Sequence, residues 1–184
     1  MLFRSRVVPI KDIKNFIIAA KIVTESIPHT MFYIIGPDDE DMSYYNECIQ
    51  LVKNFKIEEN IIFTGKADVR EYYSFLDVMV LSSIREAQPL VILEAYAAGI
   101  PVVSTRVGNV PEMLDYDDNL LADPKDSFKL ADGIIKLYRD EEYRKTLIKE
   151  NREKVIKYYS KNDLISTYDS LYSEYINKSH VNVS

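Results

Sequence analysis

Two glutamates, eight positions apart, are the residues of this sequence whose placement most suggests chemistry. Glu86 follows a short apolar run, and Glu94 lies in the helix that Pro89 is expected to open. Proline suits the first helical position because its missing N–H would have no partner there. The unpaired amides and the positive dipole end of such a helix start attract phosphate. Glu94 lies roughly 7 Å along the helix axis from Pro89. The two carboxylates therefore suit a sugar and a ribose on either side of a diphosphate.

Short and long segments alternate along the chain and indicate how these glutamates are positioned. Short apolar runs, rich in β-branched and aromatic residues, alternate with amphipathic helical patterns, which is typical of a parallel sheet covered by helices on both faces. We therefore expect an α/β fold of three layers, with a Rossmann-like doubly wound parallel sheet. The expected strands are residues 6–9, 31–35, 61–64, 78–81, 101–105 and 119–121, and the expected helices are residues 12–27, 43–55, 69–76, 89–98, Ser127–Arg139 and 141–159.

One further helix is expected near the end of the chain, over residues 161–176, with an apolar and tyrosine-rich stripe. The sequence is therefore divided into a main domain, residues 1–159, and a C-terminal helix and tail, residues 160–184. The stripe on the last helix suits packing on the main domain.

The bulk composition excludes several classes of protein. A chain of 184 residues fits one domain with a substantial core, and no second full domain. The net charge of −6 argues against a broad surface for nucleic acid or anionic membrane. Cys48 is the only cysteine, so no internal disulfide can form, and a reducing compartment, by default the cytoplasm, is expected. No apolar run approaches the roughly 18 residues of a transmembrane segment.

The segment that begins at Glu86 resembles the E-x7-E motif of retaining glycosyltransferases with the GT-B fold, the group often called family 4. The motif usually reads E-G-F-G-L-x-x-x-E-A-M-A-x-G-x-P-V-V-A, and this chain has E-A-Q-P-L-V-I-L-E-A-Y-A-A-G-I-P-V-V-S. The departures are Ala-Gln-Pro for Gly-Phe-Gly and Tyr96 for Met. The Ala-Gln-Pro loop and the upstream residues 6–14 are similar to the branch that builds the Pel-type exopolysaccharide.

The resemblance implies one half of a larger enzyme. GT-B enzymes have two Rossmann-like halves with the active site between them, and the similarity, from Arg6 to about Tyr159, covers the C-terminal, donor-binding half. The implied function is that of a hexosyltransferase using a nucleoside diphosphate sugar such as UDP-glucose in exopolysaccharide or glycoconjugate synthesis. We expect the acceptor half to be lost or supplied by another chain, so that this chain alone is weakly active or inactive. The exposed cleft face, and a last helix that in the family crosses to the other half, could then support self-association.

The resemblance also implies roles for individual residues. Arg6 and Lys11 match the family's Arg-x4-Lys pair, which contacts the donor diphosphate and would neutralise the leaving group. Glu86 matches the position that binds donor-sugar hydroxyls, and Glu94 the position that accepts hydrogen bonds from the ribose hydroxyls. We expect Arg6, Lys11 and Glu86 to act in catalysis. The cradle for phosphate and sugar is expected to comprise Ala87, Gln88, Pro89, Leu90 and Val91, although Pro89 removes one amide donor.

Two other loops follow expected strands. Gly65 and Lys66 match the family's loop that holds the nucleotide base, although a generic strand-loop-helix connection would look similar. The acidic run at residues 38–41 suggests hard oxygen ligands for a divalent cation. A solvated turn that caps the next helix is the simpler interpretation of that run, and we expect neither a metal nor a cofactor besides the sugar nucleotide.

Other functions fit the same sequence. The chain could be an inactive or regulatory module, derived from a glycosyltransferase, that binds nucleotide or associates with itself. It could also resemble nucleotide-sugar epimerases built on two similar halves, or be a doubly wound protein without a nucleotide site. In that last case the glutamates would be surface carboxylates, and Arg6 and Lys11 would be solvated cations.

Overall fold

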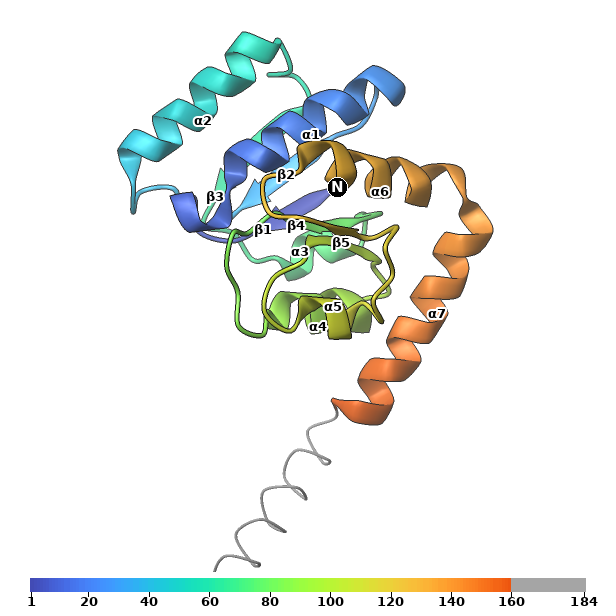
Figure 1. Cartoon of the computed structure of the whole chain (residues 1–184). Helices are drawn as coiled ribbons and strands as arrows, with labels where there is room; N and C mark the ends of the chain where they lie inside the picture. Colours follow the sequence, from blue (N-terminus) through green and yellow to red (C-terminus); the bar gives the residue numbers. More distant parts are fainter. Residues whose placement is uncertain (160–184) are drawn as a thin grey trace, which may run out of the picture.

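A six-stranded parallel sheet forms the centre of the protein, as the computed structural model of residues 1–159 shows (Figure 1). The strands run in the order β3-β2-β1-β4-β5-β6, and every neighbouring pair is parallel. Their bounds are β1 Leu2–Arg4, β2 Phe32–Ile35, β3 Ile61–Gly65, β4 Met79–Leu81, β5 Val102–Thr105 and β6 Leu121–Ala122. The helix expected over residues 161–176 lies outside the described residues.

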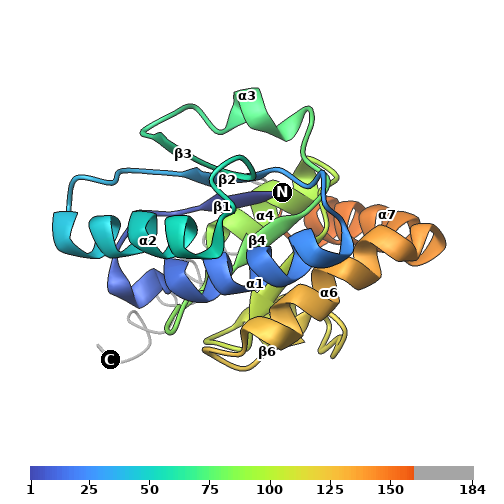
Figure 2. The ribbon, with the colours of Figure 1, turned by 90° about the horizontal axis from the view of Figure 1, so that it is seen from above.

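Helices cover both faces of this sheet (Figures 1 and 2). Helices α1, α2 and α6 lie on one face, α3, α4 and α5 lie on the other, and α7 runs beside α4. The predicted doubly wound, three-layer fold is therefore confirmed. The bounds are η1 Pro9–Lys11, α1 Ile13–Ser26, α2 Met42–Phe55, α3 Arg70–Tyr73, α4 Leu90–Ala97, α5 Val110–Met113, α6 Ser127–Arg139 and α7 Glu141–Tyr158.

The core lies between the sheet and its helices. Strands β4 and β5 are buried along their whole length, as expected for parallel strands covered on both faces. Helix α1 packs an apolar face on the sheet, where the rings of Phe16 and Phe32 meet edge to face at 5.8 Å. Burial on both faces explains why β4 is a continuous apolar run in the sequence and why β5 begins with two valines.

The first predicted strand, residues 6–9, is wrong. Strand β1 ends at Arg4, and Pro9 begins the short helix η1. Val7 and Val8 are nevertheless buried, and the Val7 amide donates to the Pro37 carbonyl at 2.9 Å. The apolar character of residues 7 and 8 therefore reflects a loop that packs on the core.

Three other predicted elements differ from the structure. Pro89 does not occupy the first turn of α4, because it is the extended N-cap residue with ψ of 104°, and the helix begins at Leu90. The helix predicted over residues 69–76 is shortened to Arg70–Tyr73, and the strand predicted over residues 119–121 forms at Leu121–Ala122. Helix α5, Val110–Met113, was not predicted.

Strands β1 and β4 mark the point where the direction of strand order reverses. They pair through Leu2 with Met79 and Phe3 with Val80, although 75 residues or more separate them along the chain. In open parallel sheets, ligands bind beyond the carboxyl ends of the strands at such a switch point. The loops after β1 and β4 are therefore where a site is expected.

Helix α7 contacts two other helices of the domain, α4 and α5. It packs against α4, and its Lys154 ammonium donates to the Met113 carbonyl at 3.0 Å at the end of α5. The Tyr143 hydroxyl donates to the Asp117 carboxylate.

Among the helices of residues 1–159, none has both the length and the apolar character needed to cross a bilayer.

Candidate active site

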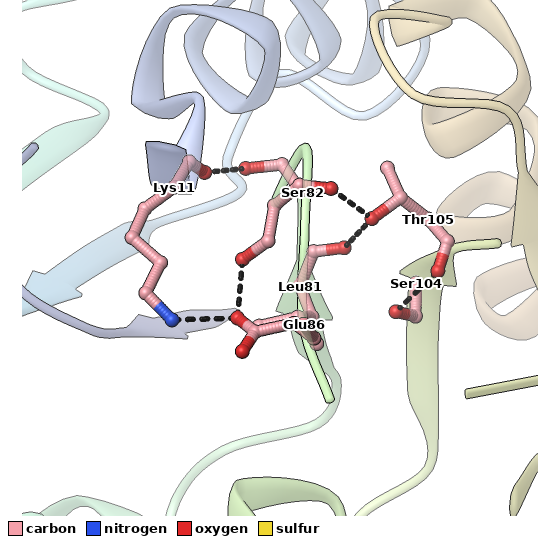
Figure 3. Close-up of polar contacts among 7 residues, drawn as sticks. Lys11, Leu81, Ser82, Glu86, Ser104 and Thr105 are labelled. Atoms are coloured by element: carbon pink, nitrogen blue, oxygen red, sulfur yellow. Dashed lines mark hydrogen bonds and ion pairs between the residues drawn. The ribbon is translucent and has the colours of Figure 1, made fainter. Parts of the chain in front are cut away.

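Lys11 and Glu86 meet at the switch point of the sheet (Figure 3). The Lys11 Nζ lies 2.6 Å from Glu86 Oε1. Lys11 ends η1, beyond β1, and Glu86 lies in the loop after β4, so the fold brings together residues 75 positions apart. Only 18% of the Lys11 side chain and 14% of the Glu86 side chain are exposed. Two of the predicted catalytic residues therefore form one sheltered ion pair.

Two consecutive serines attach these loops to each other. The Ser83 hydroxyl donates to Glu86 Oε1 at 2.7 Å. The Ser82 hydroxyl lies 3.0 Å from the carbonyl oxygen of Lys11 (Figure 3). It lies at the same distance from the carbonyl oxygen of Asp12. Side-chain hydroxyls thus fix both the carboxylate and the backbone that carries the ammonium group.

The segment after β5 supports the Glu86 loop from another side. The Thr105 hydroxyl donates to the Ser83 carbonyl at 2.6 Å, and the Asn109 amide donates to the Ala87 carbonyl at 2.9 Å. Between them, Gly108 has φ of 52°, a left-handed conformation that favours glycine. The Glu86 loop, which follows β4, is therefore held by contacts from the ends of two other strands, β1 and β5.

Asp12 joins η1 to α1 in a left-handed conformation, with φ of 47° and ψ of 53°. Glycine adopts such a positive φ at little steric cost. Aspartate is one of the few other residues that tolerates it. Burial raises the pKa of the Asp12 carboxyl above its ordinary value.

Glu94 lies on α4 with its side chain exposed. Its Oε2 accepts a hydrogen bond of 3.1 Å from the hydroxyl of Tyr73, the last residue of α3. The carboxylate is accessible to a ligand and has a partner that orients it.

Arg6 is directed to an acid from another loop. Its Nη1 lies 2.7 and 3.0 Å from the two carboxylate oxygens of Glu40, and both side chains are about half exposed. In this structure Arg6 binds Glu40, whereas Lys11 binds Glu86.

The other predicted loop residues lie along the same edge of the sheet. Gly65 ends β3 with φ of 64°, its carbonyl accepts from the Gly36 amide at 3.0 Å, and Lys66 follows it on the surface. Ala87 and Gln88 are exposed, Pro89 is buried, Leu90 is 64% exposed and Val91 is half-buried. Amides in the first turn of α4 lack intrahelical acceptors, as at any helix start.

Several contributing residues had no predicted role, namely Ser82, Ser83, Thr105, Gly108, Asn109 and Tyr73. The adjacent hydroxyls of Ser82 and Ser83 directly before the Glu86 loop were a usable signal. The contribution of Gly108 depends on a close approach between loops that no local pattern reveals.

The acidic run after β2 serves α2. The Asp41 carboxylate accepts from the Tyr44 amide at 2.9 Å and thereby caps the helix. Within residues 1–159, no three His, Cys, Asp or Glu side chains gather so as to hold a metal ion.

A cavity of about 510 Å³ opens at the opposite, amino-terminal edge of the sheet, lined by residues that include His29, Tyr33 and Asp77. It lies across the sheet from Lys11 and Glu86, so it is separate from the candidate site.

Residues 1–154 match the family described as "Glycosyl transferases group 1". The curated N-acetyl-alpha-D-glucosaminyl L-malate synthase of Bacillus anthracis is 36% identical over 155 residues, which are 83% of this chain and 39% of that protein. The chain spans about two fifths of the length of the first curated relatives it matches.

Solved structures share the fold. The C-terminal domain of the group 1 protein LpcC from Francisella tularensis superimposes with a TM-score of 0.79 at 28% identity, covering 87% of this chain and 86% of that one. HepE from Anabaena, solved in complex with UDP, has a TM-score of 0.82 at 22% identity, covering 96% of this chain and 48% of that one. The chain thus belongs to the glycosyl transferases group 1 family, and its domain has the fold found in GT-B glycosyltransferases.

Proposed function

We propose that this chain is the donor-binding half of a retaining hexosyltransferase, which takes its sugar from a nucleoside diphosphate donor of the UDP-glucose type. The observation that carries the proposal is the Lys11–Glu86 pair, with 2.6 Å between Nζ and Oε1, at the switch point of the sheet. A cation and a carboxylate at this place suit a diphosphate and a sugar that lie side by side.

The ion pair is a suitable resting arrangement for such a site. Its two side chains are mostly shielded, so each charge needs a partner before a ligand arrives. A bound diphosphate would offer Lys11 a stronger anion, and Glu86 would turn to hydroxyls of the sugar while Ser83 keeps one of its oxygens in place. The pair is thus exchanged for ligand contacts without leaving a bare buried charge.

Glu94 and the start of α4 complete the proposed site. The exposed carboxylate suits the two ribose hydroxyls, and unpaired amides at Leu90 and Val91 suit phosphate oxygens. We propose that Gly65 and Lys66, at the end of β3, hold the base. The UDP bound in HepE supports this fold as a nucleotide-binding frame, and uridine is our proposal for this chain.

In the proposed transfer, the bond between the anomeric carbon and the β-phosphate oxygen breaks, and its electron pair leaves with the nucleoside diphosphate. An acceptor hydroxyl forms the new bond on the same face, and its proton passes to the departing phosphate. Lys11 stabilises the charge that develops on the leaving group. A second half, from a longer chain or a partner, would hold the acceptor, so this chain alone should bind the donor and transfer sugar poorly.

The proposed process is synthesis of an exopolysaccharide or another glycoconjugate. The Ala87-Gln88-Pro89 loop, similar to the Pel-type branch, favours the polymer. The curated relative that joins N-acetylglucosamine to malate favours a small glycoconjugate.

Titration calorimetry with UDP and UDP-glucose tests the proposal. We expect binding by the wild-type chain and at least a roughly tenfold loss for both ligands on Lys11→Met, because it removes a charged contact to the diphosphate. Glu86→Ala should cause a comparable loss for UDP-glucose only, because Glu86 is proposed to contact the sugar. The exposed Lys14–Glu47 pair between α1 and α2 supplies matched controls, Lys14→Met and Glu47→Ala, which should bind normally. Absence of heat and of thermal shift with either ligand would refute the proposal. Self-association that ignores UDP would then favour the association module.

A further inference from the structure

Tyr73 and Glu94 connect two helices on the same face of the sheet. Tyr73 ends α3, which follows the loop at Gly65 and Lys66, whereas Glu94 lies in the middle of α4, after the Glu86 loop. The Tyr73 hydroxyl donates to Glu94 Oε2 at 3.1 Å. The proposed base loop and the proposed ribose carboxylate are thus linked through one side-chain hydrogen bond.

This bond restricts a side chain that would otherwise sample many rotamers. A glutamate on the exposed side of a helix has three rotatable bonds, and ordering it on ligand binding costs conformational entropy. A donor fixed on a neighbouring helix orders the carboxylate before the ligand arrives. A carboxylate has about four acceptor positions, and the bond to Tyr73 uses one of them.

We infer that Tyr73 is a positioning residue that sets the preference of this site for ribose over 2′-deoxyribose. The inference rests on the proposed function, because it assumes that Glu94 binds ribose. Tyr73 acts through Glu94, so its effect must depend on the ribose 2′-hydroxyl and on the carboxylate.

Tyr72, the preceding residue, offers a matched control. Its ring packs on Tyr33 at 5.7 Å and on Phe75 at 5.6 Å between centroids. Within residues 1–159, its hydroxyl makes no hydrogen bond to another side chain or carbonyl. Tyr72→Phe and Tyr73→Phe therefore make the same chemical change, and only the second removes the bond to Glu94.

The experiment measures the dissociation constants of UDP and 2′-deoxy-UDP for the wild-type chain and four variants: Tyr73→Phe, Tyr72→Phe, Glu94→Ala and the double variant Tyr73→Phe/Glu94→Ala. We expect Tyr73→Phe to weaken UDP binding about three- to tenfold and to weaken 2′-deoxy-UDP, which keeps only the 3′-hydroxyl, by a smaller factor. Tyr72→Phe should match the wild type. In the Glu94→Ala background, Tyr73→Phe should have no further effect, as coupled residues require.

The outcomes separate this inference from the proposed function. If Tyr73→Phe leaves the ratio of the dissociation constants of UDP and 2′-deoxy-UDP unchanged, the inference is overturned, while UDP binding itself stands. The inference is also overturned if Tyr73→Phe weakens UDP binding in the Glu94→Ala background as much as it does in the wild type. Failure of the wild-type chain to bind UDP would overturn both. Melting temperatures of the two phenylalanine variants should agree, since only a hydroxyl on a partly exposed ring is removed.

Discussion

Gly108 lies against the peptide that joins Glu86 to Ala87. A β-carbon on Gly108 would be 2.5 Å from the Ala87 carbonyl oxygen and closer still to that of Glu86. Real β-carbons do not approach backbone oxygens so closely, so one of the two loops would have to move. The spacing between the end of β5 and the Glu86 loop therefore requires glycine at position 108.

Gly108→Ala should lower both stability and nucleotide affinity. The left-handed φ alone costs alanine roughly 1–2 kcal/mol, and displacement of the Glu86 loop adds to that cost. Gly99→Ala is the matched control, because Gly99 also has a positive φ of 75° but its nearest neighbour, a methyl of Ile148, is 3.7 Å away. Urea unfolding and UDP titration compare them. Equal unfolding free energies for the two variants would contradict the proposed crowding.

Asp12→Asn should stabilise the protein at pH 7, by about a few tenths of a kcal/mol after solvent screening. Burial raises the pKa of the Asp12 carboxyl above 3.8, so the folded state binds its proton more tightly than the unfolded state. The ionised carboxyl therefore weakens the fold above the raised pKa, and acidification toward 3.8 removes that penalty.

Urea unfolding of the wild type and Asp12→Asn at pH 7 and near pH 4 provides the measurement. The difference in unfolding free energy between the wild type and Asp12→Asn should become smaller as the pH falls. Asp39→Asn, in an exposed turn, controls for the loss of one negative charge. A difference that widens on acidification would show that the sign is wrong.

Cys48 should not react with thiol reagents in the folded protein. The side chain is fully buried on α2, and burial raises the pKa of its thiol to about 12, so almost no thiolate exists at pH 8. Ellman's reagent should label no thiol in buffer and one thiol per chain in guanidinium chloride. Rapid labelling of the native protein would mean that α2 opens from the sheet.

Arg6 should contribute less to nucleotide binding than Lys11. Its guanidinium is held by Glu40 on the surface, whereas Lys11 lies at the switch point. Arg6→Met should therefore weaken UDP binding by less than Lys11→Met. Glu40→Gln should strengthen it slightly if the ligand competes with Glu40 for Arg6. A larger loss for Arg6→Met than for Lys11→Met would show that Arg6 leaves Glu40 and becomes the main diphosphate contact.

The fold was predictable because strands that are buried on both faces appear in the sequence as short apolar runs between amphipathic helical patterns. Strands β2 to β5 were expected within about two residues of their observed bounds. Strand β1 was misplaced because it has only three residues, and the more conspicuous Val7 and Val8 pack in a loop. Helix α5 is a single turn, too short for periodicity to reveal.

The candidate site was predictable in part. The Arg-x4-Lys pair identified Lys11, and the E-x7-E motif identified Glu86. The structure brings these two residues into contact. The partners of Arg6 and Glu94 could not be anticipated, because Glu40 and Tyr73 come from other loops and helices and follow no fixed spacing. Contacts between distant segments are set by the sheet order, which a single sequence does not specify.

The pairing of β1 with β4 has a mechanical consequence. Only two residue pairs form this junction, and it divides the sheet into halves of three strands each. Lys11 belongs to one half and Glu86 to the other, so a molecule bound by both would link the two halves across this short junction. Donor occupancy should thereby slow the separation of the two halves, and amide protons along β1 would exchange with solvent more slowly in the loaded state.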